Sequence, residues 1–225
     1  VEIIYIDLAS LKSVRAFVEE IFKREAPVAL LMNNSGIMEQ QGRTITEDGM
    51  ERTVQVNYVG HYLLSRLLVP KMERGSRIVS MTSLTYRWGR IDFPTFFDSG
   101  CRGSYWRIFP YFNSKLAITL FTIKLAKELK DKGIMVNCAD PGIVATDIIY
   151  FKMWFDSLTR VLFAPYIRTP RQGAATAIRL LLSKDVEGQT GTFNLSCHEK
   201  KLGKKYTQSP MLEKLWAETA KRVGL

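Results

Sequence analysis

The sequence lacks long apolar runs and has few cysteines. No apolar run reaches the roughly 18 residues that a membrane span needs, and the start shows no signal-peptide pattern. The 3 cysteines, Cys101, Cys138 and Cys197, are widely spaced. Because they form neither a metal-binding pattern nor a disulfide framework, we expect no metal site and a reducing, cytoplasmic location.

The chain has a strong excess of positive charge but no nucleic-acid recognition motif. Its formal net charge is +10, and its densest basic group, His198 to Tyr206, is short. We interpret the charge as a solvated basic surface, compatible with a groove that attracts an anionic cofactor. Nucleic-acid binding is the alternative, and we do not expect it. With 225 residues, of which 46% are hydrophobic, one globular domain over 1–225 is expected.

Short apolar runs alternate with amphipathic stretches along the chain. Several of the runs are almost continuously apolar, which is typical of parallel strands covered on both faces by helices. The pattern therefore predicts an α/β fold, a doubly wound parallel sheet. The expected strands are residues 1–7, 28–36, 76–83, 134–142 and 191–195, and the expected helices are 10–25, 46–72, 110–130 and 169–183.

Two long segments, 84–109 and 143–168, interrupt this alternation. Both are rich in aromatic residues and follow the carboxyl ends of strands, where open α/β sheets bind ligands. We expect them to form a largely apolar substrate pocket. Its aromatic residues in the first segment are Trp88, Phe93, Phe96, Phe97, Tyr105 and Trp106, and the second contributes Tyr150, Phe151, Trp154, Phe155, Phe163 and Tyr166.

Several polar residues stand near strand ends or inside apolar helices, and each has an ordinary structural explanation. Gly36 ends an Asn-Asn-Ser-Gly turn, where a backbone without Cβ can pass close to a ligand. Asn57 lies in an apolar helix and needs partners for its amide. These partners are neighbouring backbone groups, or else the helix is distorted and frees a carbonyl for a water. Tyr111 and Lys115 stand one helical turn apart.

Hydroxyl and turn residues follow two further strands. Ser80, Thr82 and Ser83 either end a strand or point into the ligand crevice. Pro141 and Gly142 form a turn directly after another strand, and Thr146 follows as a helix cap or a ligand contact.

The order and spacing of these residues over nearly the whole chain resembles the short-chain dehydrogenase/reductase family. Within it, "TEDGMERTVQVNYVGHYLLSRLL" and "YFNSKLAITLFTIKLAKELKDKGI" resemble the retinol-dehydrogenase-like branch. The resemblance implies a Rossmann-like fold and an NAD(P)-dependent oxidoreductase. The cofactor is NAD or NADP, with NADP slightly favoured by the branch.

The resemblance also implies catalytic roles. Tyr111 would be the general acid/base, and Lys115 would hold the nicotinamide ribose and lower the tyrosine pKa. Ser83 would donate a hydrogen bond to the substrate oxygen. Asn57 would keep a water that links Lys115 to solvent.

Cofactor contacts are implied at further positions. Asp7 would meet the adenine, and Asn33 and Gly36 would line the cofactor. The nicotinamide carboxamide would be seated by Pro141, Gly142 and Thr146.

The family's N-terminal strand, its glycine-rich Thr-Gly-x-x-x-Gly-x-Gly turn and the following helix have no counterpart here. The chain begins at what corresponds to the family's third strand, so an N-terminal β-α-β-α portion is absent and we expect a fragment of a longer protein. Residues 1–7 would then lack neighbours, and strand 28–32 would have an unpaired edge. The alternative function is a non-catalytic binding or interaction module.

An apolar alcohol or carbonyl compound, retinoid-like or steroid-like, is the expected substrate. The aromatic segment is also compatible with peripheral membrane contact, because it carries Lys152, Arg160 and Arg168. By analogy with the family, a homodimer would form through the helices that carry Asn57 and Tyr111.

Overall fold

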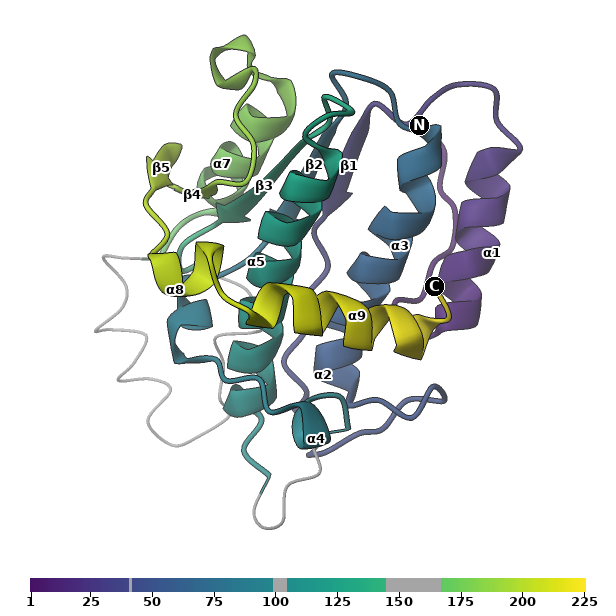
Figure 1. Cartoon of the computed structure of the whole chain (residues 1–225), viewed down its shortest axis with the longest axis vertical. Coiled ribbons are helices and arrows are strands. Elements are labelled where there is room, and N and C mark those ends of the chain that lie inside the picture. Colours follow the sequence, from purple (N-terminus) through teal and green to yellow (C-terminus); the bar gives the residue numbers. More distant parts are fainter. Residues whose placement is uncertain (41, 99–104, 145–166) are drawn as a thin grey trace.

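A five-stranded sheet forms the centre of the computed structural model, which describes residues 1–40, 42–98, 105–144 and 167–225 (Figure 1). The first four strands are parallel, and the last pairs antiparallel with the fourth. The predicted parallel α/β sheet is therefore confirmed. In spatial order the strands are β1 (Leu30–Asn33), β2 (Arg77–Met81), β3 (Met135–Asp140), β4 (Phe193–Leu195) and β5 (His198–Lys200).

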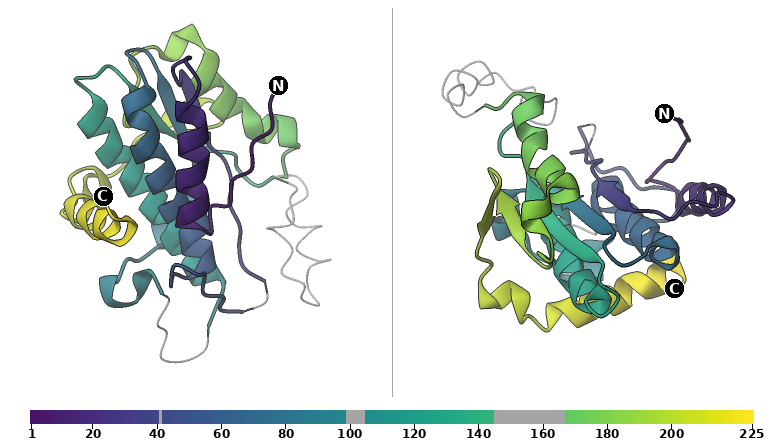
Figure 2. Two further views of the ribbon diagram at one scale, coloured as in Figure 1. Left: turned by 90° about the vertical axis from the view of Figure 1, so that its right-hand side faces the viewer. Right: turned by 90° about the horizontal axis from the view of Figure 1, so that it is seen from above.

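Helices cover both faces of this sheet (Figure 2). On one face lie α1 (Leu11–Phe22), α3 (Gly60–Leu68) and α5 (Ile108–Leu129). On the other lies α7 (Pro170–Leu182), whose Ala177 and Leu180 pack on Val79 and Ala139 of the strands. Because both faces are covered, all six residues of β3 are buried, the polar Asn137 and Asp140 among them.

The strand predicted over residues 1–7 does not form. These residues have no regular structure, and Val1 and Ile3 are exposed. A strand needs a neighbour for its backbone hydrogen bonds, and none of the described strands lies beside this segment. In the part of the chain that the structure describes, β1 is the edge of the sheet.

The helix predicted over 46–72 begins later and is irregular. Residues 46–51 form a turn in which Gly49 has a φ of +74°. Helix α2 (Arg52–Val54) follows, with the Glu51 carboxylate accepting from the Val54 N–H at 2.8 Å as its cap. A π-helical turn (Gln55–Val59), α3 and a 3-10 turn (Val69–Lys71) complete the segment. A short helix α4 (Phe93–Phe96) lies farther along.

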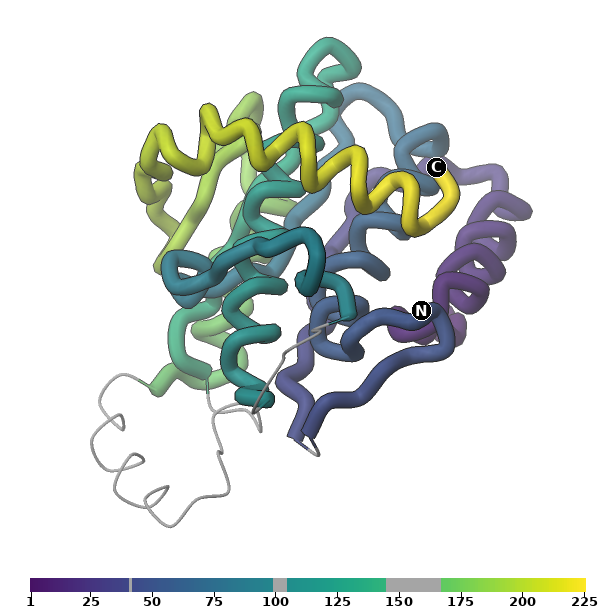
Figure 3. The backbone as a smooth tube through the Cα atoms, turned by 60° about the horizontal axis from the view of Figure 1, so that its bottom comes forward, coloured from purple at the N-terminus to yellow at the C-terminus, as the bar shows by residue number. Residues whose placement is uncertain are grey.

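The last helix, α9 (Met211–Val223), crosses the outer side of α3 and α5 after the short α8 (Lys204–Thr207) (Figure 3). The Trp216 ring stacks on Phe121 of α5 with centroids 6.0 Å apart. The Tyr62 hydroxyl donates to the Trp216 carbonyl at 3.1 Å. Leu215 is only 1% exposed, so α9 is part of the hydrophobic core.

We expect Leu215→Ala to lower the free energy of unfolding by about 3 kcal/mol, because it leaves a cavity between α9 and α5. Leu182→Ala is the matched control, since Leu182 on α7 is 65% exposed and should lose less than about 0.5 kcal/mol. Urea unfolding followed by circular dichroism measures both. Equal losses in the two variants would contradict the packing of α9.

Candidate active site

Ser83, Tyr111 and Lys115 come together at the carboxyl end of β2. Ser83 follows the strand and caps the 3-10 turn Leu84–Trp88. Tyr111 and Lys115 lie one turn apart on α5 and therefore share a face. The Lys115 Nζ lies 5.6 Å from the centroid of the Tyr111 ring. A hydrogen bond from the Ser83 side chain reaches Tyr111 and lowers its pKa.

Lys115 is a buried cation. Its side chain is 5% exposed, and its Nζ donates to the Met81 carbonyl at 3.2 Å. Burial lowers the pKa of Lys115 to about 8, while the Asp140 carboxylate acts in the opposite sense. Lys115 is therefore mainly protonated at neutral pH and loses its charge in mildly alkaline solution.

The environment of Tyr111 favours the neutral phenol. Burial and, after it, the Asp140 carboxylate raise the pKa of Tyr111 to about 12. The one lowering contribution comes from the Ser83 hydrogen bond, so the expectation that Lys115 lowers this pKa stays a prediction. At neutral pH Tyr111 can donate a proton.

Asn57 lies in the π-helical turn, and its side chain binds the backbone of Ile37, the residue after Gly36. Its Oδ1 accepts from the Ile37 N–H at 2.7 Å, and its Nδ2 donates to the Ile37 carbonyl at 2.8 Å and to Ser114 Oγ at 3.0 Å. The amide is thus bonded to backbone, and the helix is also distorted, as π-helical turns at functional sites often are. Asn57 fixes residues 33–37 against α5.

Gly36 allows this turn to lie directly against Lys115. A Cβ at Gly36 would lie 3.3 Å from Lys115 Nζ and 3.6 Å from Asn57 Oδ1. A side chain there would displace the lysine or fill the space beside it. Because Gly36 has no side chain, a ligand hydroxyl group could approach Lys115 along the backbone of this turn.

Two other polar side chains near the strand ends donate hydrogen bonds inside the protein. The Asn33 Nδ2 donates to Ser65 Oγ at 2.9 Å and to Ser80 Oγ at 3.3 Å, so Asn33 links β1 to β2 and α3. Thr82 Oγ1 donates to the Lys115 carbonyl at 3.3 Å. Of these strand-end hydroxyl groups, that of Ser83 is hydrogen-bonded to Tyr111. Its predicted contact with a substrate oxygen stays a prediction.

The Pro141–Gly142 turn is held from two sides. The Gly142 N–H donates to Asp140 Oδ1 at 2.7 Å, and Arg168 Nη1 donates to the Pro141 carbonyl at 3.3 Å. Gly142 has a φ of +72°, a conformation that favours glycine. Thr146 lies outside the described residues, so its predicted contact stays a prediction.

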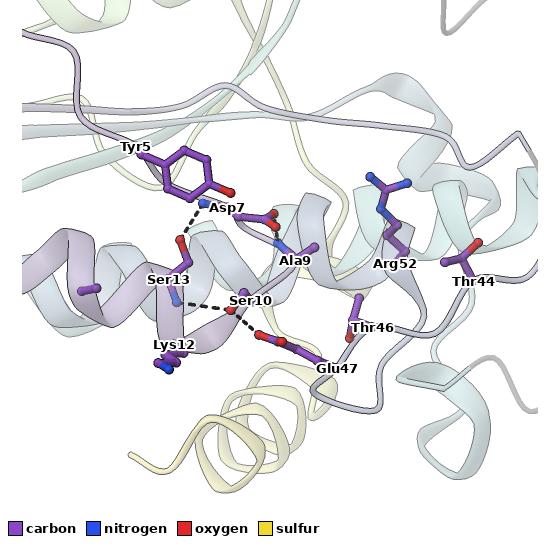
Figure 4. A pocket seen from close by; sticks show the side chains of 11 residues that line it. Tyr5, Asp7, Ala9, Ser10, Lys12, Ser13, Thr44, Thr46, Glu47 and Arg52 are labelled. Atoms are coloured by element: carbon purple, nitrogen blue, oxygen red, sulfur yellow. Dashed lines mark hydrogen bonds between the residues drawn. The ribbon is translucent and has the colours of Figure 1, made fainter.

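Asp7 lies in a separate cavity of about 660 Å³ beside the start of α1 (Figure 4). Its Oδ1 accepts from the Ala9 N–H at 2.8 Å, and its own N–H donates to Ser13 Oγ at 2.9 Å. The volume is in the range of small-molecule sites. The lining comes from three segments: Tyr5, Asp7 and Ala9, then Ser10, Lys12, Ser13 and Ala16, then Thr44, Thr46, Glu47 and Arg52.

Sequence reasoning missed two titratable residues around Lys115. The His61 Nε2–H donates to the Ser35 carbonyl at 2.9 Å, and burial lowers the pKa of His61 to about 4. Asp140 is 2% exposed and acts on both Tyr111 and Lys115. A carboxylate at the end of a buried strand, directly before Pro-Gly, was the available signal for Asp140.

The predicted pocket wall is only partly supported. Phe96 and Phe97 are 3% and 1% exposed and belong to the core, where Phe96 packs on Tyr58. Both rings therefore face the core, and their predicted part in a pocket wall stays a prediction. Trp88 and Trp106 are more than half exposed. Residues 145–166 of the second segment lie outside the described part of the chain.

Among the described helices, none is both long and apolar enough to cross a membrane.

Solved structures share this fold. An uncharacterized protein from Mycobacterium paratuberculosis superposes with a TM-score of 0.75 at 24% identity, covering 99% of this chain and 75% of its own. A short chain dehydrogenase from Burkholderia cenocepacia in complex with NADP gives a TM-score of 0.63 at 23% identity, over 85% and 73% of the two chains.

Sequence comparisons agree and are more specific. Retinol dehydrogenase 14 of Mus musculus is 38% identical over 98% of this chain, and that of Homo sapiens is 39% identical. The chain spans 66% of the length of both. Human retinol dehydrogenase 12 is 32% identical, with 69% of it covered. The short chain dehydrogenase family model matches residues 1–96 and 99–152. The chain therefore belongs to the short-chain dehydrogenase family, in its retinol-dehydrogenase-like branch.

Proposed function

We propose that this chain carries the catalytic site of a nicotinamide-dependent oxidoreductase that interconverts an apolar alcohol and its carbonyl compound. The convergence of Ser83, Tyr111 and a buried Lys115 carries the proposal. These groups are a hydrogen-bond donor, a proton donor and a cation, which is what proton transfer to a carbonyl oxygen requires. A binding module has no need of such an arrangement.

The residues present fit a nicotinamide cofactor. The bare backbone at Gly36 lies directly against Lys115 Nζ with no side chain between them, and Asp7 lines a cavity of suitable volume. Asp7 would contact the adenine, Lys115 and Gly36 the ribose, and Pro141, Gly142 and Thr146 the carboxamide. When bound, the nicotinamide supplies or accepts the hydride. We propose NADP as the first cofactor to test, in line with the branch, and NAD as the alternative.

The proton chemistry follows from the charge states of the side chains. With the pKa of Tyr111 at about 12, its phenol would donate a proton to the carbonyl oxygen during reduction. The Ser83 hydroxyl would donate a hydrogen bond to that same oxygen. As the phenolate forms, the protonated Lys115 stabilises it across the shared helix face. Alcohol oxidation uses the same groups in reverse.

A hydrophobic substrate is supported by the aromatic residues near this end of α5. Trp106 and Phe109, at the beginning of the helix, and Trp88, whose ring lies 5.6 Å from that of Phe112, are all more than half exposed. Retinol is the first candidate because the related chains are named retinol dehydrogenases. The same aromatic surface would suit peripheral membrane contact. The free thiols Cys138 and Cys197 fit a reducing, cytoplasmic compartment.

A homodimer through the helices of Asn57 and Tyr111 has little support. Helix α9 lies across the outer side of α3 and α5 (Figure 1). A second copy would have to displace Trp216 and Leu215 from the core. We therefore propose no dimer through this face.

We expect Tyr111→Phe, made in the full-length protein, to lower kcat at least ~100-fold, because the variant removes the proton donor. Cofactor affinity and the unfolding midpoint should change little, since the ring remains. Retinal reduction with NADPH or NADH, followed by loss of nicotinamide absorbance, measures the rate. Tyr206→Phe, in α8, is the matched control and should keep wild-type activity. Full activity in Tyr111→Phe would refute the assignment.

The pH dependence provides a second test. Because the pKa of Lys115 is about 8, kcat/KM for carbonyl reduction should fall as pH rises through about 8, when the cation that stabilises the phenolate is lost. The pH profile of the steady-state rate measures this. In Lys115→Arg the cation persists, so this alkaline fall should disappear even if the rate is lower. A fall at the same pH in that variant would assign it to another group.

A further inference from the structure

Asp140 is a buried carboxylate at the carboxyl end of β3, the strand that precedes the Pro141–Gly142 turn. Only one of its oxygens has a hydrogen-bond partner among the described residues: Oδ1 accepts from the Gly142 N–H at 2.7 Å, whereas Oδ2 has none. Burying a charge costs free energy unless other groups compensate it. The Gly142 N–H occupies only one oxygen of the carboxylate, so the burial of the other oxygen calls for a further explanation.

The charged and titratable groups around Asp140 come from several elements. Helix α5 contributes Tyr111 and Lys115, and the segment before α7 contributes Arg168. On β3 itself, burial raises the pKa of the Cys138 thiol, and the Asp140 carboxylate adds to this increase. From α3, the neutral His61 faces Lys115. Among the described residues, Asp140 is the carboxylate that acts on both members of the tyrosine–lysine pair.

The influence of Asp140 has the same direction at both groups. Its negative charge raises the pKa of Lys115 against the effect of burial, which favours the ammonium form. It also raises the pKa of Tyr111, which favours the neutral phenol. Burial raises the pKa of Asp140 itself, while the N–H groups of Gly142 and Leu84 and the cations of Lys115 and Arg168 lower it. The Leu84 N–H belongs to the residue after Ser83.

We propose that Asp140 is a positioning residue that keeps the transferable protons on Tyr111 and Lys115 at neutral pH, and so sets the pH range of the site. This inference rests on the proposed function and deepens it. The strand register brings Asp140 to the end of β2 that holds Lys115: Asp140 follows Ala139, which pairs with Met81, and the Met81 carbonyl accepts from Lys115 Nζ at 3.2 Å. In the proposed arrangement Asp140 contacts neither substrate nor cofactor. Through its hydrogen bond from the Gly142 N–H it also holds the turn that follows β3.

Removing the charge should move both titrations to lower pH, because each pKa would fall. Lys115 would then be neutral over more of the physiological range and would no longer stabilise the phenolate that forms during carbonyl reduction. Arg168 would not replace the lost interaction, since its guanidinium is held by the Pro141 carbonyl at 3.3 Å and by Ser196 Oγ at 2.7 Å.

The test is Asp140→Asn in the full-length protein. The amide oxygen can still accept from the Gly142 N–H, so the turn is retained while the charge is lost. The alkaline fall in kcat/KM for carbonyl reduction, expected near pH 8 in the wild type, should shift by about one pH unit to lower pH. Asp131→Asn is the matched control, because Asp131 is exposed just beyond α5, and its profile should coincide with that of the wild type.

A profile unchanged in pH, with a uniformly lower rate, would show that Asp140 serves only the turn and would overturn the proposal. Circular dichroism at each pH confirms that the variant remains folded. A fall that shifts in Asp140→Asn but not in Asp131→Asn supports the proposal, since a structural role alone does not move a titration.

A second measurement does not depend on activity. The near-ultraviolet absorbance of the Tyr111 phenolate is followed in a pH titration of the wild type and of Asp140→Asn. The contribution of the other tyrosines is removed by subtracting the titration of Tyr111→Phe from that of the wild type, and the titration of the double variant from that of Asp140→Asn. Phenolate that forms at lower pH in Asp140→Asn supports the proposal, and coincident curves overturn it. If the wild type fails to oxidise or reduce any alcohol–carbonyl pair, the proposed function fails while this titration still decides the role of Asp140.

Discussion

The burial of the Lys115 ammonium is the constraint on which the rest of the site depends. A buried cation is tolerated only where hydrogen-bond acceptors and opposite charge surround it. The Met81 carbonyl accepts from Nζ at 3.2 Å, and the Asp140 carboxylate raises the pKa of the ammonium. The turn ending at Gly36 closes over the same atom, which is possible because glycine has no Cβ. Strand ends of the sheet and the middle of α5 are thereby fixed relative to one another.

Much of this arrangement was predictable from the sequence, because it follows from local pattern and order. Continuously apolar strands separated by helices predicted a parallel sheet, and both faces are covered. Spacing placed Tyr111 and Lys115 on one helix face. An Asn in an apolar helix predicted either backbone partners or a distorted helix, and Asn57 shows both. In each case the type of one residue and its position in the sequence sufficed for the prediction, and the identity of its contact partners was not needed.

The errors arose where partners distant in sequence decide the outcome. Residues 1–7 have a strand-like pattern, but strands form only in pairs, and no described neighbour supplies the pairing. The β4–β5 hairpin turns at Ser196 and Cys197, both with positive φ, where glycine or asparagine would have been the usual sequence signal. Hydrophobicity alone could not show that Phe96 packs in the core.

Helix α9 extends the network of the site to the opposite side of the protein. Asn57 and Tyr58 are adjacent in the π-helical turn, yet they face different layers. Asn57 bonds to Ile37 at the site, whereas the Tyr58 hydroxyl lies 2.7 Å from Thr219 Oγ1 of α9. The two side chains leave one short turn in different directions, so this turn is bonded to the candidate site on one side and to α9 on the other. Helix α9 therefore packs on the element that carries Asn57 as well as on the core.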